Sequence, residues 1–199
     1  GLVARYDFEG SVRDHSENQL DGVMADVSQI VTGATKCRSG KSALLLDGTT
    51  NYVRIPTSVA HLSQTTIAVW VYNPGNFTEN SRLFDFGLDD ARNAYLSLNQ
   101  AGKIILTMKN GDKVQTVDGG AFPEGWHHLA ITIGAEAITI YVDGKVQGSA
   151  TPVILRLADI RPVCNYIGAG QDVNVPLMNG YVDDLRIYNY ELNRSEIEE

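Results

Sequence analysis

The stretch TIAVWVY, residues 66–72, decides the fold class of this chain. β-Branched and aromatic residues fill the stretch and Asn73-Pro74-Gly75 ends it with a turn signal, which is the pattern of a β-strand. Asn110-Gly111 and Asp143-Gly144 separate further runs of this kind and predict tight hairpins. The other predicted strands cover residues 81–86, 94–98, 103–109, 112–117, 128–133, 137–142, 145–147 and 181–188. Turn signals at this spacing are typical of a β-sandwich or barrel, so the sequence predicts an all-β protein.

The length and composition are those of one globular domain. The chain has 199 residues, of which 43% are hydrophobic, and no linker, repeat or low-complexity segment divides it. A chain of this length buries roughly 70% of its unfolded surface, so it can form a core without metals or disulfides. We therefore expect a single domain over residues 1–199. The only expected helical turn is at residues 195–199, with Asn193 or Ser195 as its N-cap.

The charge balance and hydropathy exclude two classes of partner. Lys and Arg number 16 against 24 Asp and Glu, which gives a net charge of −8. Such a chain lacks the basic patch with which proteins bind nucleic acid, and no apolar run is long enough to span a membrane. The first residue is Gly1 rather than Met, which fits a processed N-terminus from which a targeting signal has been removed.

The two cysteines leave two alternatives open. Cys37 and Cys164 are far apart in the sequence, and nothing in the sequence fixes the distance between them in space. They form either one long-range disulfide or two free thiols.

Five phrases of the sequence, taken in order, resemble one known family. They are ARYDFEG at 4–10 with VRDHSEN at 12–18, GKSALLLDG at 40–48 with NYVRIP at 51–56, IAVWV at 67–71, GWHHLA at 125–130 with YVDG at 141–144, and GYVDDLRIYN at 180–189. Together they are similar to the laminin G-like members of the concanavalin A-like lectin/glucanase superfamily. The resemblance implies a jelly-roll β-sandwich of two curved antiparallel sheets. It leaves function open, because enzymes, lectins and accessory modules share this fold.

Glycoside hydrolysis, the best-known chemistry of this superfamily, needs two carboxylates that face one sugar. The superfamily's glucanases place them as Glu-x-Asp-x-Glu on one strand, where the period of two aligns the acids on one face. The sequence contains no such phrase. The nearest acidic cluster is Asp85, Asp89 and Asp90, which we interpret as a solvated loop after a strand. We therefore expect no glucanase-type active site.

Two aromatic phrases have structural interpretations. In Trp126-His127-His128 the histidines alternate across a strand, so they cannot chelate one ion together. We interpret this phrase as a packing signature of a core strand, and Trp70, which lies inside an apolar run, as a core anchor.

A carbohydrate-binding surface is the remaining hypothesis for a site. Sugar sites use aromatic rings against C–H faces, and amide, acid or Arg groups for the hydroxyls. The middle of the chain supplies candidates of these types, namely Tyr72, Asn73, Arg82, Asp85, Tyr95 and Asn99.

The resemblance also implies one structural calcium ion, where the N-terminal and C-terminal strands run close together. The oxygen ligands it indicates are Asp7, Asp14, the carbonyl of Gly48, and Asp183. Calcium accepts mixed shells of carboxylate, carbonyl and water oxygens, so four protein ligands and water suffice.

These observations predict a non-catalytic, lectin-like carbohydrate-binding module of a secreted or cell-surface protein, located outside the cell, in the periplasm or on the cell surface. Its expected partners are a carbohydrate or glycoconjugate and other domains of a longer polypeptide, as in an accessory module of a glycan-degrading enzyme. The alternatives are a protein-binding adhesion domain and a divergent glycoside hydrolase.

Overall fold

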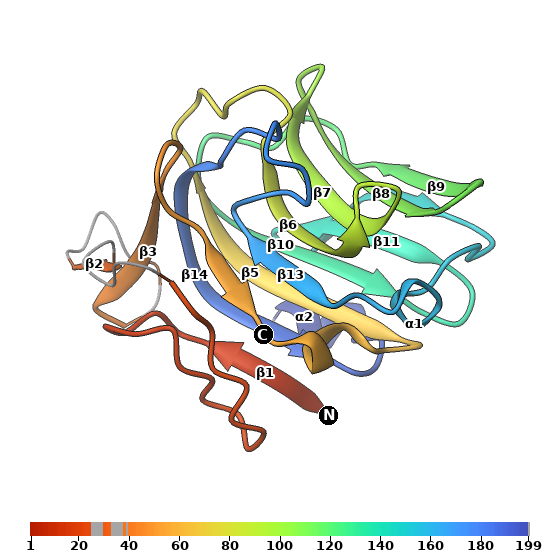
Figure 1. Ribbon diagram of the computed structural model, residues 1–199, viewed down its shortest axis with the longest axis horizontal. Helices are drawn as coiled ribbons and strands as arrows, with labels where there is room; N and C mark the ends of the chain where they lie inside the picture. The colour runs from red at the N-terminus through yellow and green to blue at the C-terminus, as the bar shows by residue number, and fades with distance from the viewer. Residues whose placement is uncertain (25–29, 33–37, 39, 199) are drawn as a thin grey trace.

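The stretch at 66–72 forms the centre of β5 (Thr65–Asn73), a middle strand of the larger of two antiparallel sheets. The computed structural model describes residues 1–24, 30–32, 38 and 40–198. Within them the two sheets pack face to face (Figure 1). The predicted all-β sandwich is therefore confirmed.

The larger sheet has eight strands, and we call its solvent-facing side the back face. Along the main path the order is β12 (Lys145–Ala150), β11 (Ile138–Val142), β10 (Gly125–Ile133), β5, β14 (Asn179–Tyr188), β3 (Ser42–Asp47) and β2 (Ile30–Thr32). The short β1 (Leu2–Tyr6) also pairs with β14, antiparallel. The N-terminal strand and the last strand thus lie side by side.

The smaller sheet has six strands, and we call its solvent-facing side the front face. Its order is β4 (Val53–Ile55), β13 (Cys164–Ile167), β6 (Arg82–Asp89), β7 (Arg92–Gln100), β8 (Lys103–Asn110) and β9 (Lys113–Asp118). β8 and β9 form the hairpin that Asn110-Gly111 predicts, and β10 and β11 form another around residues 134–137.

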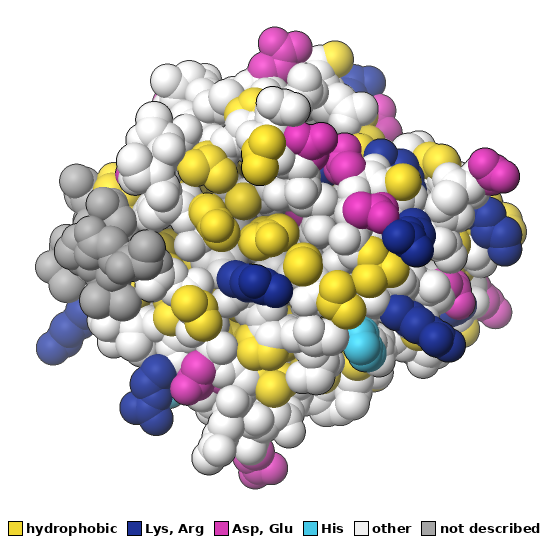
Figure 2. Space-filling model, viewed as in Figure 1, with side chains coloured by type: hydrophobic (Ala, Val, Ile, Leu, Met, Phe, Trp, Pro, Cys, Tyr) yellow, Lys and Arg dark blue, Asp and Glu magenta, His cyan; other side chains and the backbone are white. Residues whose placement is uncertain are grey.

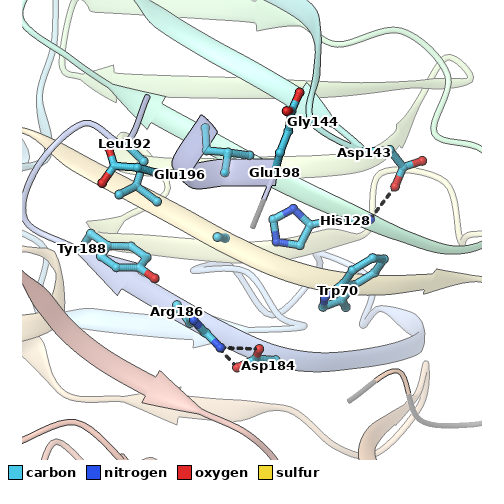
Figure 3. Close-up of a pocket in the computed structure, with 12 residues that line it drawn as sticks. Trp70, His128, Asp143, Gly144, Asp184, Arg186, Tyr188, Leu192, Glu196 and Glu198 are labelled. Atoms are coloured by element: carbon cyan, nitrogen blue, oxygen red, sulfur yellow. Dashed lines mark hydrogen bonds and ion pairs between the residues drawn. The ribbon is translucent and has the colours of Figure 1, made fainter. Parts of the chain in front are cut away.

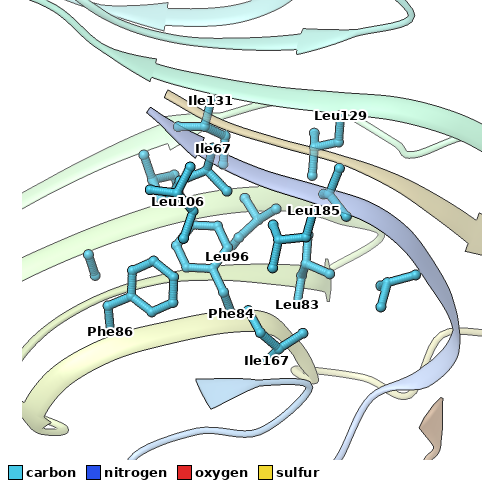
Figure 4. Packing of buried hydrophobic residues seen from close by; sticks show 14 of the residues in the cluster. Ile67, Leu83, Phe84, Phe86, Leu96, Leu106, Leu129, Ile131, Ile167 and Leu185 are labelled. Carbon is cyan, nitrogen blue, oxygen red and sulfur yellow. The ribbon is translucent and has the colours of Figure 1, made fainter. Parts of the chain in front are cut away.

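The core lies between the sheets, and every second side chain of each central strand points into it. Ile67, Leu129 and Ile131 of the eight-stranded sheet face Phe84, Phe86, Leu96 and Leu106 of the six-stranded sheet (Figure 4). All of these side chains are almost fully buried. Their burial stabilises each by about 1.5–3 kcal/mol relative to exposure.

Strand alternation corrects the expectation for Trp70. On β5 the side chains of Ile67, Val69 and Val71 enter the core, so Ala68 and Trp70 point to the back face. Trp70 is half-buried there, and the guanidinium of Arg38 lies 3.9 Å from its ring. Trp70 is therefore a surface aromatic and not a core anchor. The expectation was wrong because a run that is apolar on both faces does not reveal which face is the core.

Helices are few and short among the described residues. α2 (Arg194–Glu198) confirms the terminal turn, and Asn193 is its cap: its Oδ1 accepts a hydrogen bond from the backbone N–H of Glu196. The sequence missed α1 (Leu157–Ile160) and the 3₁₀ turn η2 (Thr57–Ala60), since elements of four residues show no periodicity. In the described part of the chain, no helix has the length and apolar character that crossing a membrane requires.

Candidate functional site

One transverse row of side chains crosses the whole front face. The pairing registers of the six strands place these residues opposite one another, in the order Arg54, Tyr166, Asp85, Tyr95, Thr107 and Thr116. Figure 2 shows the molecule from this side, with hydrophobic side chains gathered over β4, β13 and the adjoining loops, and charged groups mainly around them. The front face thus combines aromatic, charged and hydroxyl groups on a rigid sheet.

A pocket opens at the β13 end of this row. Tyr52, just before β4, and Tyr166 on β13 meet edge to face, with ring centroids 5.6 Å apart. The loop 169–177 and Thr49 form the other walls of the pocket, whose volume is about 450 Å³. Tyr52 is 42% exposed, so part of its ring is free to contact a ligand. This size lies within the range of small-molecule sites, roughly 300–1,000 Å³.

Polar groups line the pocket loop. Asp172 and Asn174 are exposed, and the backbone N–H of Asn174 donates to Asp172 Oδ1 at 2.8 Å in a tight turn. Next to them Val173 is 98% exposed. Aromatic rings on one wall and hydrogen-bonding side chains on the other are the combination that a sugar ring requires.

Asp85 holds the pocket loop against the sheet. The backbone N–H of Gln171 donates to Asp85 Oδ2 at 3.0 Å, and its side-chain amide donates to the carbonyl of Cys164 at 2.8 Å. Gln171, which directly precedes the polar turn at Asp172, is thereby fixed to β6 and β13. Asp85 is fully buried, so it acts on the pocket through Gln171 rather than by direct contact.

A buried ion pair beside the pocket corrects the interpretation of the Asp85, Asp89 and Asp90 cluster. Only Asp89 and Asp90 lie at the strand end and its turn, whereas Asp85 sits inside β6. Arg82 Nη1 lies 2.6 Å from Asp85 Oδ2 and 2.8 Å from Asp90 Oδ1. Burial raises the pKa of Asp85, and the charge of Arg82 opposes that rise. A charged residue is buried only where a partner neutralises it. Because the sequence alone does not show that Arg82 reaches Asp85, it could not reveal that this carboxylate is buried.

Tyr95 has its ring covered by cations. The guanidinium of Arg82 lies 3.5 Å from the ring centroid, and the ammonium of Lys109 lies 5.5 Å away. Such cation–π contacts stabilise the row but occupy a ring face that a sugar would use. Of the six candidate residues, Arg82, Asp85 and Tyr95 thus lie together, and they support the sheet beside the pocket.

Tyr72, Asn73 and Asn99 lie outside this pocket. Tyr72 is on the back face, packed edge-on against Trp126 and Tyr181. Asn73 is buried and donates to the carbonyl of Phe122, while Asn99 donates to the carbonyl of Phe77. These two amides stabilise the turns near their strand ends.

Sequence reasoning missed Tyr52, Tyr166 and the loop 169–177. Tyr52 and Tyr166 are more than a hundred residues apart, and only the pairing of β4 with β13 brings them together. The alternation Val53-Arg54-Ile55, with its exposed middle residue, indicates an outward face on β4. No comparable signal indicates the partner strand.

The histidine phrase behaves as the alternation predicts. His128 contacts Trp70 on the back face, with ring centroids 5.1 Å apart. His127 contacts Phe122, and its Nδ1 lies 2.6 Å from Asp143 Oδ2. The two imidazoles take part in separate sets of contacts, so they do not share a ligand.

Of the two alternatives for the cysteines, a disulfide or free thiols, the structure shows the state of Cys164. Cys164 is a free thiol on the front face, where its Sγ accepts a hydrogen bond from Arg54 Nη2 at 3.7 Å. Cys37 lies outside the described residues.

The residues predicted to bind calcium have other partners in the structure. The two oxygens of Asp14 accept hydrogen bonds from the backbone N–H groups of Arg5, Ser16 and Leu20 and from the hydroxyl of Ser16. A carboxylate offers about four acceptor positions, so Asp14 has none left for a cation and does not fit a calcium shell.

The other three predicted ligands show no common site. Asp7 Oδ1 lies 3.3 Å from His15 Nε2, Asp183 Oδ2 accepts from the backbone N–H of Arg38, and Gly48 lies beside Asn179. The described ranges hold no group of three or more acidic, histidine or cysteine residues placed for a metal ion. The calcium ion stays a prediction.

Comparison with known families gives one match. A laminin G-like family model, described as the concanavalin A-like lectin/glucanases superfamily, matches residues 47–198. Among curated proteins, none matches the sequence.

Several solved structures are similar in fold. Domain 4 of AbnA, a GH43 extracellular arabinanase from Geobacillus stearothermophilus in complex with arabinotriose, superposes with a TM-score of 0.76 at 22% identity, covering 99% of this chain and 96% of that one. The binding domain of Paraclostridial Mosquitocidal Protein 1 gives 0.73 at 18%, covering 99% and 51%. The botulinum neurotoxin serotype C1 binding domain gives 0.73 at 13%, covering 99% and 50%. The chain thus spans about half of each toxin domain, and identities this low show a shared fold alone.

Proposed function

The chain belongs to the concanavalin A-like lectin/glucanases superfamily, and we propose that it is a non-catalytic carbohydrate-binding module whose ligand occupies the front-face pocket. The observation that favours this function is the pair Tyr52 and Tyr166, which presents ring surface beside the polar loop 169–177. Aromatic surface beside exposed hydrogen-bonding groups suits the C–H faces and hydroxyls of a sugar.

The setting of the module is part of the proposal. We place it in a secreted or cell-surface protein, next to other domains that act on glycans. The arabinanase domain that shares the fold comes from an extracellular enzyme and was solved with arabinotriose. That likeness supports the class of ligand and leaves the identity of the sugar to experiment.

A protein-binding adhesion domain is the second candidate, because aliphatic side chains are exposed in the pocket loop, next to β4 and just before β13. Val173 is 98% exposed, Val163 is 42% exposed and Val23 is 69% exposed. Exposed aliphatic groups of this kind occur at protein interfaces. The two candidates differ in what binds the front face.

Binding to a broad panel of plant, microbial and host polysaccharides tests the proposal. We expect saturable binding to at least one glycan, with affinity reduced on the order of tenfold or more, about 1.4 kcal/mol or more, in Tyr52→Ala and Tyr166→Ala. Val146→Ala is the control, since Val146 is 53% exposed on β12 of the other sheet, away from the pocket. No binding across the panel would favour protein adhesion, and equal losses in all three variants would contradict the assignment of the glycan to this pocket.

A further inference from the structure

A second pocket lies on the opposite side of the sandwich, between the back face and helix α2. Its floor is Ala68 of β5, and its walls include Trp70, His128, Tyr188 and the terminal helix (Figure 3). The volume is about 280 Å³, near the lower end of small-molecule sites. The pocket therefore suits one ring rather than a chain of several.

The helix wall is a fixed part of this pocket. Leu192 and Ile197 are buried and pack against Ala68 and Ala130 of the sheet. Asn193 caps the helix through the backbone N–H of Glu196, and Arg194 Nε lies 3.1 Å from Glu198 Oε1. The side chains of Glu196 and Glu198 are thereby held at the rim.

The carboxylates that line the pocket have partners within the protein, although those of Glu196 are hydrogen-bond donors and not a cation. Asp184 lies 3.1 Å from Arg5 Nε and 2.9 Å from Arg186 Nη2. Asp143 lies 2.6 Å from His127 Nδ1, and Glu198 pairs with Arg194. A charged ligand would have to compete with these pairs, whereas a neutral ligand can use the carboxylate lone pairs that remain.

His128 supplies polar atoms without a competing partner. No hydrogen bond from the described residues reaches either nitrogen of its ring, which meets Trp70 edge-on at 5.1 Å between centroids. Burial lowers the pKa of His128, which favours the neutral imidazole with one donor and one acceptor. The guanidinium of Arg38 covers part of the Trp70 ring at 3.9 Å, so the pocket combines an apolar floor, the remaining surface of the indole and a neutral donor–acceptor group.

We propose that this back-face pocket is a second ligand site, which binds a single neutral sugar ring against Ala68, Trp70 and His128. The site is independent of the front-face pocket, because the two lie on the outer faces of different sheets. A module with both sites can join two glycan chains. Binding at both sites at once raises the apparent affinity, although the affinity of each single site is unchanged.

Tryptophan fluorescence separates the two sites. The chain has two tryptophans, and neither of them lines the front-face pocket. In Trp126→Phe, emission reports on Trp70 alone. This substitution also removes a buried indole N–H that has no partner in the described structure, so we expect the fold to tolerate it.

The probes are arabinose, xylose, glucose, galactose and fructose, with glucuronic acid and glucosamine as charged comparators. In Trp126→Phe we expect a saturable change of emission with at least one neutral sugar, and at least tenfold weaker binding of its charged comparators. Ala68→Leu fills the floor and should abolish the change. His128→Gln should weaken it at least fivefold, while Tyr166→Ala should leave it intact.

Three results would overturn the second site: no saturable change with any neutral sugar, tighter binding of the charged comparators, or loss of the signal in Tyr166→Ala. Circular dichroism and thermal melts of Ala68→Leu verify that it is folded. If it is not, retention of full affinity in His128→Gln contradicts the proposal by itself. Since Tyr166→Ala removes only the front-face site, failure of one site is distinguishable from failure of the other.

Discussion

Asp85 links the stability of β6 to the shape of the front-face pocket. It is fully buried, it neutralises Arg82 at 2.6 Å, and it accepts the backbone N–H of Gln171 at the start of the pocket loop. Asn93 adds a side-chain hydrogen bond at 3.1 Å. Loss of this carboxylate leaves a buried guanidinium with Asp90 as its remaining acidic partner, and leaves Gln171 without its acceptor.

Asp85→Ala should therefore destabilise the protein by roughly 3–5 kcal/mol, the cost of breaking a buried ion pair from one side. Asp89→Ala is the control, because the pair of Asp89 with Arg92 is exposed and should contribute little. Urea denaturation of the two variants measures the difference. Similar unfolding midpoints would contradict this account of Asp85.

His128 predicts how stability depends on pH. Burial lowers its pKa in the folded state, while the charges of Asp143 and Asp184 oppose that shift. Below the unfolded pKa of about 6.5, the unfolded chain therefore binds the proton more readily than the folded chain. The free energy of unfolding should fall as the pH decreases from about 6.5 toward 5.

His128→Asn should flatten this part of the pH profile, and Thr116→Asn, at an exposed residue that does not titrate, should leave it unchanged. Thermal melts between pH 7.5 and 5 measure the effect. If the two variants show the same slope as the parent protein, burial of His128 is not its cause.

At the scale of elements, the β6–β7 hairpin depends on a glycine. A Cβ on Gly87 would lie 2.4 Å from Asn93 Cβ and 2.8 Å from the carbonyl oxygen of Arg92, both in the facing strand. The absence of a side chain lets the two strands pair closely next to the ion pair of Arg82. Gly134 differs, because the atoms nearest to a Cβ there would be the side-chain carboxylate of Glu191, which can move away.

Gly87→Ala should destabilise the protein by about 1–3 kcal/mol, as other overpacked sites do, and Gly134→Ala by less than about 1 kcal/mol. Chemical denaturation of the pair measures this difference. Equal losses would show that backbone proximity in the hairpin is not the deciding factor.

Most elements could be predicted from the sequence, because strands and hairpins have local signals. The run at 66–72 became β5, and Asn110-Gly111 became the β8–β9 turn. The face of each strand was harder to predict: Trp70 stands in an apolar run, and only packing against the second sheet shows which side is the core. The pocket could not be predicted, since Tyr52 and Tyr166 meet through a pairing that local sequence does not encode.

At the scale of the whole molecule, the N-terminal segment is tied to the last strand. β1 pairs with β14, and Asp184 of β14 lies 3.1 Å from Arg5 Nε of β1. Glu9 accepts from the backbone N–H groups of Lys41 and Ser42, and Asp183 accepts from that of Arg38. Acidic groups thus hold the backbone at Arg38 and at Lys41–Ser42.

The structural calcium ion is tested at this scale. If it binds at Asp183, millimolar calcium should raise the melting temperature of metal-stripped protein, because the ion binds the folded state alone. Asp183→Asn should reduce that response more than Asp184→Asn, since Asp184 is paired with two arginines. Identical melts with calcium and with chelator would exclude the ion.

In the proposed function, an oligosaccharide binds in the front-face pocket formed by Tyr52, Tyr166 and the loop 169–177. The most direct measurement is a ¹H–¹⁵N NMR titration with an oligosaccharide of the polysaccharide that binds best in the panel. We predict saturable shifts of the backbone amides at 49–54 and 164–177, which are absent in Tyr166→Ala. A ligand that binds while leaving both of these segments unperturbed would contradict the account.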